Sequence, residues 1–341
     1  MKISKKIILI TMGDPHGIGP EICAQMLSSP DFNTAFIPVV VGDAEIMRSA
    51  LDLIKSSAKL KVISELGDVQ SHGKDQILLW EPLKYKGEFK AGKICSLAGA
   101  ASIAWVREAV LAIQGEKAVA MVTAPISKES IAPTVPGFQG HTEYIGEMCD
   151  EPRPVLTLVH KNWVISHVST HVSLREACDR VKIPRIEKTA LLLHEFLQKY
   201  RGIEKPRIGV AGLNPHAGED GLFGKEEVEE IAPAVQKLLD KGLNVAGPIP
   251  GDVIFPQLRA ELFDGVVAMY HDQGHIVTKT MLFGLGEQRK TAGVNLSLGL
   301  PVLRTSVDHG TGFDIAWQGK ADANSLIDAY ELAEVLSENN D

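Results

Sequence analysis

Three apolar runs in this sequence each end in a polar cluster built around histidine, and they span residues 164–171, 208–218 and 266–275. Imidazole nitrogens bind divalent metals, and a site with three of them keeps one coordination position open for water or substrate. Three such clusters predict a metal-assisted active site, provided that the fold brings them together. Taken singly, each histidine is equally compatible with an ordinary loop residue that hydrogen-bonds the backbone.

The apolar runs themselves indicate how the clusters would meet. Short apolar runs that stop at Gly, Pro or Asn are typical of buried parallel strands. In open α/β sheets, ligands bind beyond the carboxyl ends of the strands, where the loops form a crevice. We therefore expect the three histidine clusters at one edge of one sheet.

The rest of the chain alternates predicted strands and amphipathic helices, which favours a largely parallel sheet with helices on its faces. Further strands are predicted at residues 7–10, 39–41 and 118–124, with another strand-like run at 298–303. Helices are predicted from about residue 21 and over residues 98–114, 185–199 and 225–241. The sequence contains no internal repeat or low-complexity linker, and composition marks no domain boundary.

Composition narrows the class of protein. The 341 residues carry a net charge of −8, which argues against nucleic-acid binding because phosphate neutralisation needs a basic face. The four cysteines are scattered and form no CxxC pair, as is usual for a protein of a reducing compartment. The apolar residues near the N-terminus are too few for a signal peptide, and we expect no membrane span. These features predict a cytoplasmic enzyme.

Two glycine-containing loops are ambiguous. Residues 11–21 follow a predicted strand and open a helix, so their backbone N–H groups could hold an anion; the spacing is not GxGxxG, and a tight turn that needs glycine explains it equally well. In Gly140-His141-Thr142-Glu143, Thr142 could be a helix N-cap, or it could bind a ligand oxygen together with His141. The sequence leaves both questions open.

Several cationic and polar residues follow the third histidine cluster. Lys279 lies eight residues after His271, where it could neutralise a carboxylate or phosphate or transfer a proton; a solvated surface lysine is the alternative. Asn295 and Arg304 flank the strand-like run, and arginine suits a bidentate grip on phosphate. Residues 308–324 form a small, polar, glycine-containing loop whose composition alone predicts no ligand.

With these segments in place, the chain resembles the 4-hydroxythreonine-4-phosphate dehydrogenase family, which includes dehydrogenases of D-threonate and D-erythronate 4-phosphate. One family unit would cover residues 6–335. The matching motifs occur in the same order at residues 12–21, 140–143, 169–171, 212–219, 268–274 and 293–311. Residues 309–324 also resemble the cofactor loop of isopropylmalate and isocitrate dehydrogenases. The resemblance implies their two-lobed α/β/α fold, with expected lobes of residues 1–140 plus 305–341, and 141–304.

The resemblance also implies roles for single residues. The divalent metal (Zn, Mg, Mn or Co) would be held by His171, His216 and His271, one from each cluster. The substrate would contact His141, Thr142, Lys279, Asn295 and Arg304, and the catalytic groups would be Lys279 and Asp272. NAD or NADP would contact His309, Gly310, Asp314 and Asn324. In this family the site lies in a homodimer with both subunits contributing.

The implied reaction is NAD- and metal-dependent oxidation and decarboxylation of a 4-phosphorylated hydroxy acid, which in the vitamin B6 (pyridoxine) pathway is 4-hydroxythreonine 4-phosphate. Two departures from the typical family pattern bear on the substrate. The segment between Lys279 and Asn295 is several residues longer and adds Arg289 and Lys290. His275 follows Gly274, as in the D-threonate and D-erythronate group. We therefore expect the sugar-acid phosphates to be turned over at least as well as the amino acid.

Two other classes of function compete with this interpretation. A metal-dependent hydrolase or aldolase acting on a small phosphorylated substrate would also use three strand-end histidines, but it would have no need of the 309–324 loop. A catalytically dead ligand-binding relative is disfavoured because the three histidines, Lys279 and Arg304 are all retained. Protection by NAD against thermal unfolding would separate a dehydrogenase from a hydrolase or aldolase.

Overall fold

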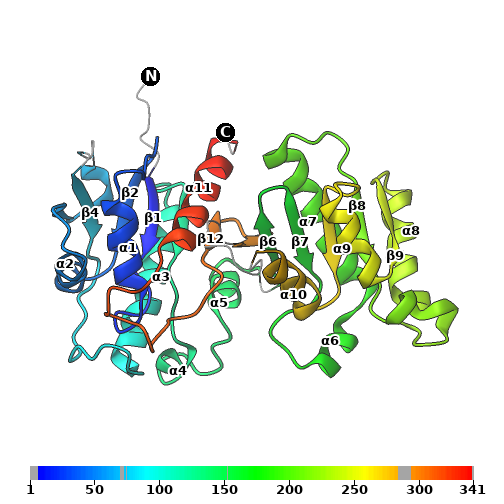
Figure 1. The fold of residues 1–341 in the computed structure, drawn as a ribbon, viewed down its shortest axis with the longest axis horizontal. Coiled ribbons are helices and arrows are strands. Elements are labelled where there is room, and N and C mark those ends of the chain that lie inside the picture. The colour runs from blue at the N-terminus through cyan, green and yellow to red at the C-terminus, as the bar shows by residue number, and fades with distance from the viewer. Residues whose placement is uncertain (1–6, 70–72, 74, 152, 283–292, 340–341) are drawn as a thin grey trace.

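In the computed structural model, which describes residues 7–69, 73, 75–151, 153–282 and 293–339, the strands form one twelve-stranded sheet flanked by helices (Figure 1). The strand order is β3-β4-β2-β1-β5-β12-β11-β6-β7-β10-β8-β9. The sheet therefore runs through the whole molecule, and the α/β class expected from the sequence is confirmed.

The first part of the chain builds one end of this sheet. Its elements are β1 (Ile7–Thr11), α1 (Gly19–Ser28), β2 (Ile37–Val41), α2 (Ala44–Leu53), β3 (Lys59–Ile63), η1 (Leu66–Asp68), β4 (Gln76–Trp80), α3 (Ser96–Gln114), β5 (Ala120–Thr123), α4 (Lys128–Ile131) and α5 (His141–Met148). The predicted strands at 7–10, 39–41 and 118–124 and the predicted helix at 98–114 correspond to β1, β2, β5 and α3.

The second part builds the other end and then returns. It comprises β6 (Val155–His160), β7 (Trp163–His167), α6 (Leu174–Arg180), α7 (Ile183–Arg201), β8 (Ile208–Ala211), η2 (Pro215–Gly221), η3 (Glu227–Ile231), α8 (Ala232–Asp240), β9 (Val245–Ile249), α9 (Gly251–Arg259), β10 (Gly265–Ala268) and α10 (His271–Leu282). The chain then crosses back through β11 (Val294–Leu298) and β12 (Arg304–Ser306) to α11 (Asn324–Glu338).

The three histidine runs are neighbours, as their apolar pattern predicts. They form β7, β8 and β10, and β10 pairs in parallel with both of the others. Their carboxyl ends therefore lie at one edge of the sheet. The middle of the sheet departs from the parallel pattern, because β6 pairs antiparallel with β7 and with β11, and β11 pairs antiparallel with β12.

The hydrophobic core is divided between the two ends of the sheet. One cluster packs around β1, β2, β5 and α11, and two others pack around β7, β8 and β10. We refer to the surroundings of the first cluster as the first lobe and those of the other two as the second lobe. Ile145 of α5 is buried in the first cluster. The predicted division placed this residue in the other lobe, with residues 141–304. The predicted lobe boundaries stay a prediction.

The strand-like run at 298–303 is not a strand, and that prediction was wrong. The structure has β11 before it and β12 after it, and the intervening residues turn the chain between two antiparallel strands. Gly299 has a φ of +86°, which favours glycine, and Pro301 has no N–H to donate to a strand partner. The run was predicted as a strand because most of its residues are apolar, and Gly299 and Pro301 were not given enough weight.

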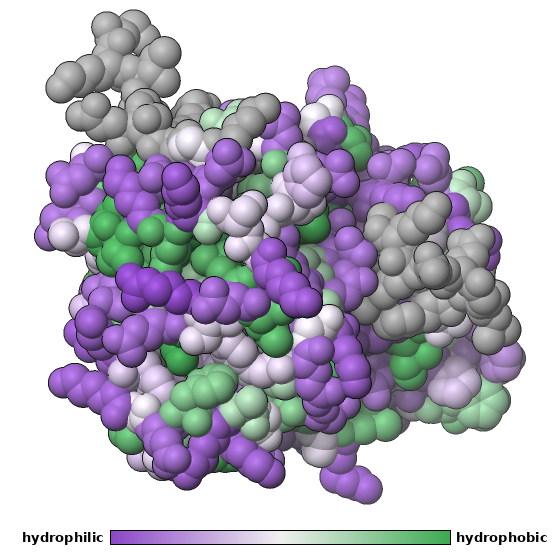
Figure 2. Space-filling model, turned by 60° about the vertical axis from the view of Figure 1, so that its left-hand side comes forward, coloured by the Kyte–Doolittle hydropathy of each residue, from purple (hydrophilic) through white to green (hydrophobic). Residues whose placement is uncertain are grey.

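Helix α3 is long and apolar enough to cross a membrane by length and composition, although we expected no such segment. It is a core helix: it contacts β1 and β5, and Trp105, Val106 and Ala109 are fully buried. The apolar character therefore reflects packing inside the first lobe. On the face drawn in Figure 2, the hydrophobic residues lie in short stretches between hydrophilic ones.

Candidate active site

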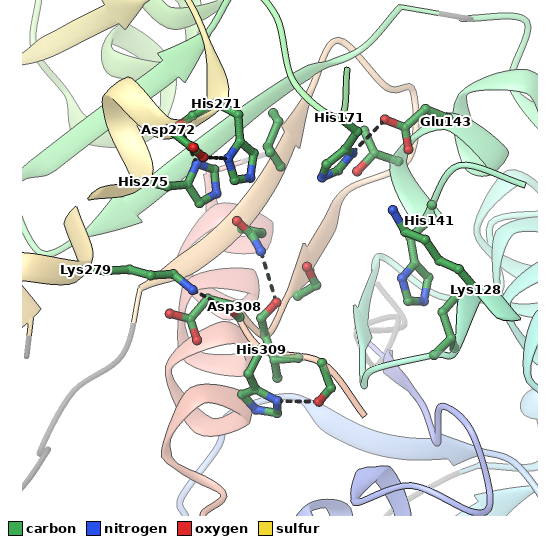
Figure 3. A pocket seen from close by; sticks show the side chains of 18 of the residues that line it. Lys128, His141, Glu143, His171, His271, Asp272, His275, Lys279, Asp308 and His309 are labelled. Atoms are coloured by element: carbon green, nitrogen blue, oxygen red, sulfur yellow. Dashed lines mark hydrogen bonds and ion pairs between the residues drawn. The ribbon is translucent and has the colours of Figure 1, made fainter. Parts of the chain in front are cut away.

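A cavity of about 690 Å³ lies where the two lobes meet, and most of the predicted site residues line it (Figure 3). Its walls come from the segment after β5 with the start of α4, from α5, from β6, from the segment after β7, from α10, and from β11 and β12 with the residues after it. The predicted residues that line it are His141, Thr142, His171, His271, Asp272, Lys279, Asn295, Arg304, His309 and Gly310.

Arg304 forms a buried cationic wall of this cavity. Its side chain is 3% exposed, and it donates hydrogen bonds to the hydroxyls of Thr123 (2.8 and 3.2 Å), Thr142 (3.0 Å) and Ser297 (3.1 Å). Burial lowers the pKa of the guanidinium to about 10, so it remains charged at neutral pH. Its hydrogen bonds all go to neutral hydroxyls, and the nearby carboxylate of Glu143 compensates its charge only in part, which favours an anionic ligand at this wall.

Helix α5 begins at His141, and Gly140 is its N-cap residue, so Thr142 is not the N-cap. Its hydroxyl instead accepts from Arg304 and lies 3.2 Å from the hydroxyl of Ser297. Burial, together with Arg304 and Lys128, lowers the pKa of His141 well below its ordinary value, so the ring is neutral. Its Nε2 is buried without a hydrogen-bond partner in the described structure and faces the cavity side of α5.

His171 and His271 face each other across the cavity in Figure 3, with ring centres 5.6 Å apart. Nδ1 of His171 lies 3.3 Å from Glu143, and Nδ1 of His271 lies 2.7 Å from Asp272. Zinc binds imidazole nitrogen at about 2.1 Å, which places a ring centre about 3.2 Å from the metal. Two rings on one metal are then about 5–6 Å apart, so this pair fits a shared divalent cation.

Two further histidines extend this cluster. The ring of His275 stacks on that of His271 at 3.7 Å, and it lies 4.9 Å from the buried ring of His167. Burial is the main reason why the pKa of His167 falls to about 3 and that of His275 to about 4, so both are neutral. Gly274 is required here, because a Cβ at that position would lie 2.2 Å from Nε2 of His167.

His216 does not join this pair within one chain. It lies in η2, its ring contacts Phe223 at 6.3 Å, and it does not line the cavity. Among the residues that the structure describes, no three His, Cys, Asp or Glu side chains form a metal-binding group. The convergence of all three predicted ligands stays a prediction.

Lys279 and Asn295 also line the cavity. Lys279 projects from α10, with Nζ 3.4 Å from the backbone oxygen of Asp308. The side-chain N–H of Asn295 donates to the backbone of Val307 at 3.1 Å, which leaves its buried Oδ1 without a partner. The ammonium of Lys279 and the unsatisfied Oδ1 of Asn295 are thus available to a ligand.

The comparisons with known proteins agree with this geometry. Residues 34–333 match the family model of the pyridoxal phosphate biosynthetic protein PdxA. The chain is 42% identical to a 4-hydroxythreonine-4-phosphate dehydrogenase of Desulforapulum autotrophicum, over 98% of this chain and 96% of the relative. It is also 42% identical to a D-threonate 4-phosphate dehydrogenase of Cupriavidus necator, over 97% of each. The crystal structure of 4-hydroxythreonine-4-phosphate dehydrogenase from Klebsiella pneumoniae superposes with a TM-score of 0.85 at 39% identity, covering 98% of this chain and all of that one.

The chain belongs to the PdxA family. Full-length coverage and the TM-score confirm both the family expected from the motifs and its fold. Two relatives named for different substrates are equally similar to this chain, so identity does not choose between the substrates. The kinship with isopropylmalate and isocitrate dehydrogenases stays a prediction.

Within this PdxA-family site, only part of the predicted cofactor set lines the cavity. His309 and Gly310 do, and Nε2 of His309 is buried without a partner in the described structure. Asp314 is exposed and Asn324 is bound to Asp322, and neither lines the cavity. The cofactor role of these four residues stays a prediction.

The loop at residues 11–21 is a tight turn that contacts residues 311–321. Gly13 has a φ of +78°, and a Cβ there would lie 2.4 Å from the oxygen of Pro125. The N–H of Ile18 donates to the oxygen of Thr311 at 2.9 Å, so it is not free for an anion. These contacts favour the turn over the anion cradle, and they tie the loop to residues 311–321.

The sequence interpretation missed several residues that line the cavity. Lys128 begins α4 just after β5, and Ser306 and Asp308 follow Arg304 along and beyond β12. Glu143 ends the motif at residues 140–143 but was assigned no role, although its carboxylate contacts Nδ1 of His171. The signal that could have identified Lys128 is its position just after the predicted strand at 118–124. Arg289 and Lys290 lie outside the described residues.

Proposed function

We propose that this chain is a metal- and NAD-dependent dehydrogenase that oxidises and decarboxylates a 4-phosphorylated hydroxy acid. The observation that carries the proposal is the placement of buried Arg304 in the same cavity as the His171–His271 pair. One wall suits a phosphate and the other suits a divalent cation. A substrate that spans both walls would carry its phosphate at one end and its reacting hydroxyl at the other.

The phosphate would bind at Arg304, Thr142 and His141, with Asn295 nearby. Hydroxyl groups hold the guanidinium in place before any ligand arrives, so little ordering is needed on binding. Lys279, which lines the same cavity, would neutralise the substrate carboxylate or transfer a proton. These roles agree with those expected for substrate contacts in the family.

His171 and His271 would present their Nε2 atoms to the metal, and Asp272 would hold His271. A divalent metal lowers the pKa of a bound hydroxyl and stabilises negative charge on its oxygen, and nicotinamide accepts hydride. His309 and Gly310 line the cavity where the cofactor would approach the substrate. Oxidation of a hydroxyl β to a carboxylate yields a β-keto acid, which readily loses carbon dioxide.

The carboxylates of the cavity do not by themselves decide whether the substrate carries an amino group. The described lining residues include Glu143, Asp272 and Asp308, and each has a partner: His171, His271 and Ser325, respectively. Oε2 of Glu143 is buried without a hydrogen-bond partner in the described structure, so the carboxylates leave room for an ammonium as well. The choice of D-threonate or D-erythronate 4-phosphate, turned over at least as well as 4-hydroxythreonine 4-phosphate, therefore rests on His275, which follows Gly274 as in the sugar-acid group.

Side-by-side measurement of kcat/KM for the three compounds, followed through NADH formation, tests this choice. We expect the two sugar-acid phosphates to match or exceed the amino acid. A pocket built to pair an ammonium would reject the hydroxyl analogue strongly, because a buried partner would be left unsatisfied. A preference above about a hundredfold for the amino acid, about 2.7 kcal/mol, would refute the choice and favour the vitamin B6 pathway.

The position of His216 supports a homodimer that shares its active sites. His216 and Ala217 have positive φ values, a conformation that non-glycine residues adopt at a cost, and the neighbouring Leu222 is 71% exposed. We infer that a second copy of the chain supplies His216 to the His171–His271 pair.

Mixing two inactive variants tests this arrangement. His171→Ala and His216→Ala are combined, unfolded, refolded together and assayed. Random pairing makes about half of the dimers mixed, and each mixed dimer would contain one site of two with all ligands intact. About a quarter of all sites would therefore recover. No recovery in verified mixed dimers would place His216 in its own chain's site or outside any site.

The alternative of a hydrolase or aldolase receives no support, because the relatives that match over nearly the whole chain are named dehydrogenases. Saturation with NAD should raise the Tm, which a hydrolase or aldolase would not show. The cytoplasm is the proposed location; the four cysteines are unpaired, which agrees with a reducing compartment. No nucleic-acid partner is expected of a chain with this negative charge.

A further inference from the structure

The histidine pair is held by two carboxylates that differ in their surroundings. Nδ1 of His171 contacts Glu143, and Nδ1 of His271 contacts Asp272. An ionised carboxylate only accepts hydrogen bonds, so each Nδ1 is the donor. In a neutral imidazole the other nitrogen, Nε2, then carries the lone pair that a metal needs.

Burial distinguishes the two pairs. The side chain of Glu143 is 23% exposed, whereas that of Asp272 is 67% exposed. Water therefore competes less with the Glu143–His171 contact than with the Asp272–His271 contact.

The Glu143–His171 contact also joins the two lobes. Glu143 lies on α5, whose Ile145 is buried in the first core cluster, and His171 follows β7 of the second lobe. Figure 3 shows the two side chains meeting from different elements. Gly140 leaves room for the carboxylate, because a Cβ there would lie 2.9 Å from Oε2 of Glu143.

We propose that Glu143 is a positioning residue of the first lobe that fixes the orientation and tautomer of the metal ligand His171 in the second lobe. The proposal rests on the metal site of the proposed function. If the lobes separated, His171 would lose this partner and rotate freely, so metal binding is tied to lobe contact. Asp272 performs the same task within the second lobe, with a smaller effect because it is exposed.

Zinc affinity tests the role without any turnover. The dissociation constant of Zn²⁺ is measured against a chromophoric chelator, without substrate or NAD, for the wild type, Glu143→Ala, Glu143→Gln and Asp272→Asn. Loss of such a partner typically weakens metal binding by about 10- to 100-fold. We expect that range for Glu143→Ala, a smaller loss for Glu143→Gln, whose amide oxygen still accepts, and the smallest for Asp272→Asn.

Glu147→Gln is the matched control. Glu147 is exposed on the same helix, and its substitution removes the same charge. It should bind zinc like the wild type. An unchanged zinc affinity in both Glu143 variants, or an equal loss in the control, would overturn the role of Glu143. A wild type that binds no zinc would overturn the metal site of the proposed function and this role with it.

A second measurement examines the pair itself in metal-free protein. The ¹⁵N chemical shifts of His171, assigned by comparison with His171→Gln, report which ring nitrogen carries the proton. We expect Nδ1–H in the wild type and the control, and a shift toward Nε2–H in Glu143→Ala. The same tautomer in all three proteins would contradict the proposal, provided that circular dichroism shows each variant folded.

Discussion

The two walls of the cavity differ in how completely one chain builds them. On the first wall, Arg304 is buried and hydrogen-bonded to three hydroxyl side chains before any ligand binds. On the second wall, His171 and His271 face each other, but the third predicted ligand, His216, lies elsewhere. Under the proposed function, recognition of the anion is preorganised within the chain, whereas the metal centre would need a further ligand.

This difference has a physical basis. A buried guanidinium must be satisfied wherever it lies, so its hydroxyl partners contribute to stability as well as to binding. Partly exposed imidazoles can leave Nε2 without a partner at little cost, so these atoms stay available for a metal and a second subunit. Substitutions on the first wall should therefore affect binding of the phosphorylated substrate, and substitutions on the second should affect turnover.

The largest effect is expected for His271→Ala. It removes one of the two facing imidazoles and the partner of Asp272. Charge stabilisation by a metal contributes several kcal/mol, so loss of about 4 kcal/mol lowers kcat about a thousandfold. Steady-state kinetics with metal analysis measures this. Normal turnover with stoichiometric metal would place the metal elsewhere.

A smaller effect, on binding, is expected for Arg304→Ala. Loss of a charge-assisted hydrogen bond costs about 1.5–3 kcal/mol, which raises KM for the phosphorylated substrate about 10- to 150-fold. Arg304→Lys should rescue little, because an ammonium cannot reach Thr123 and Thr142 at once. The affinity for NAD should stay unchanged. An equal effect on a dephosphorylated analogue would show that Arg304 does not recognise the phosphate.

The sequence predicted the elements whose signal is local. The apolar histidine runs predicted three strands with their ends at one edge, and β7, β8 and β10 lie as expected. The antiparallel pairs of β6 and β11 were not predicted, because strand pairing between distant segments has no local signal. The turn at 298–303 was missed because Gly299 and Pro301 interrupt an otherwise apolar run.

The site was predictable where residue type decides the chemistry and unpredictable where packing decides it. Arg304 and the histidines carry their chemistry in their side chains, and the family motifs located them. The role of Glu143 depends on a contact with His171, 28 residues away and in the other lobe. Thr142 could have been an N-cap, but it is a partner of Arg304, because helix α5 begins two residues earlier than an N-cap at Thr142 would require.

Acidification should lower the free energy of unfolding through the buried His167. The pKa of buried His167 is about 3, below the ordinary 6.5, so the unfolded chain binds one more proton between those values. Stability is then complete above pH 6.5 and falls by about 1.4 kcal/mol per pH unit below it. Urea unfolding of metal-free wild type and His167→Gln from pH 6.5 to 4.5 measures the difference in slope. Parallel slopes would show that His167 takes up no proton on unfolding.

The smallest effect is expected for Thr142→Val, which keeps the shape of the side chain and removes its hydroxyl. Nη1 of Arg304 then keeps Ser297 as its partner at 3.1 Å, so the guanidinium is loosened but not released. Loss of about 1 kcal/mol should raise KM for the phosphorylated substrate about fivefold and leave kcat nearly unchanged. A dephosphorylated analogue should show no change. If KM instead rose as much as in Arg304→Ala, Thr142 would bind the phosphate as strongly as Arg304 does, and its main role would not be to hold the guanidinium.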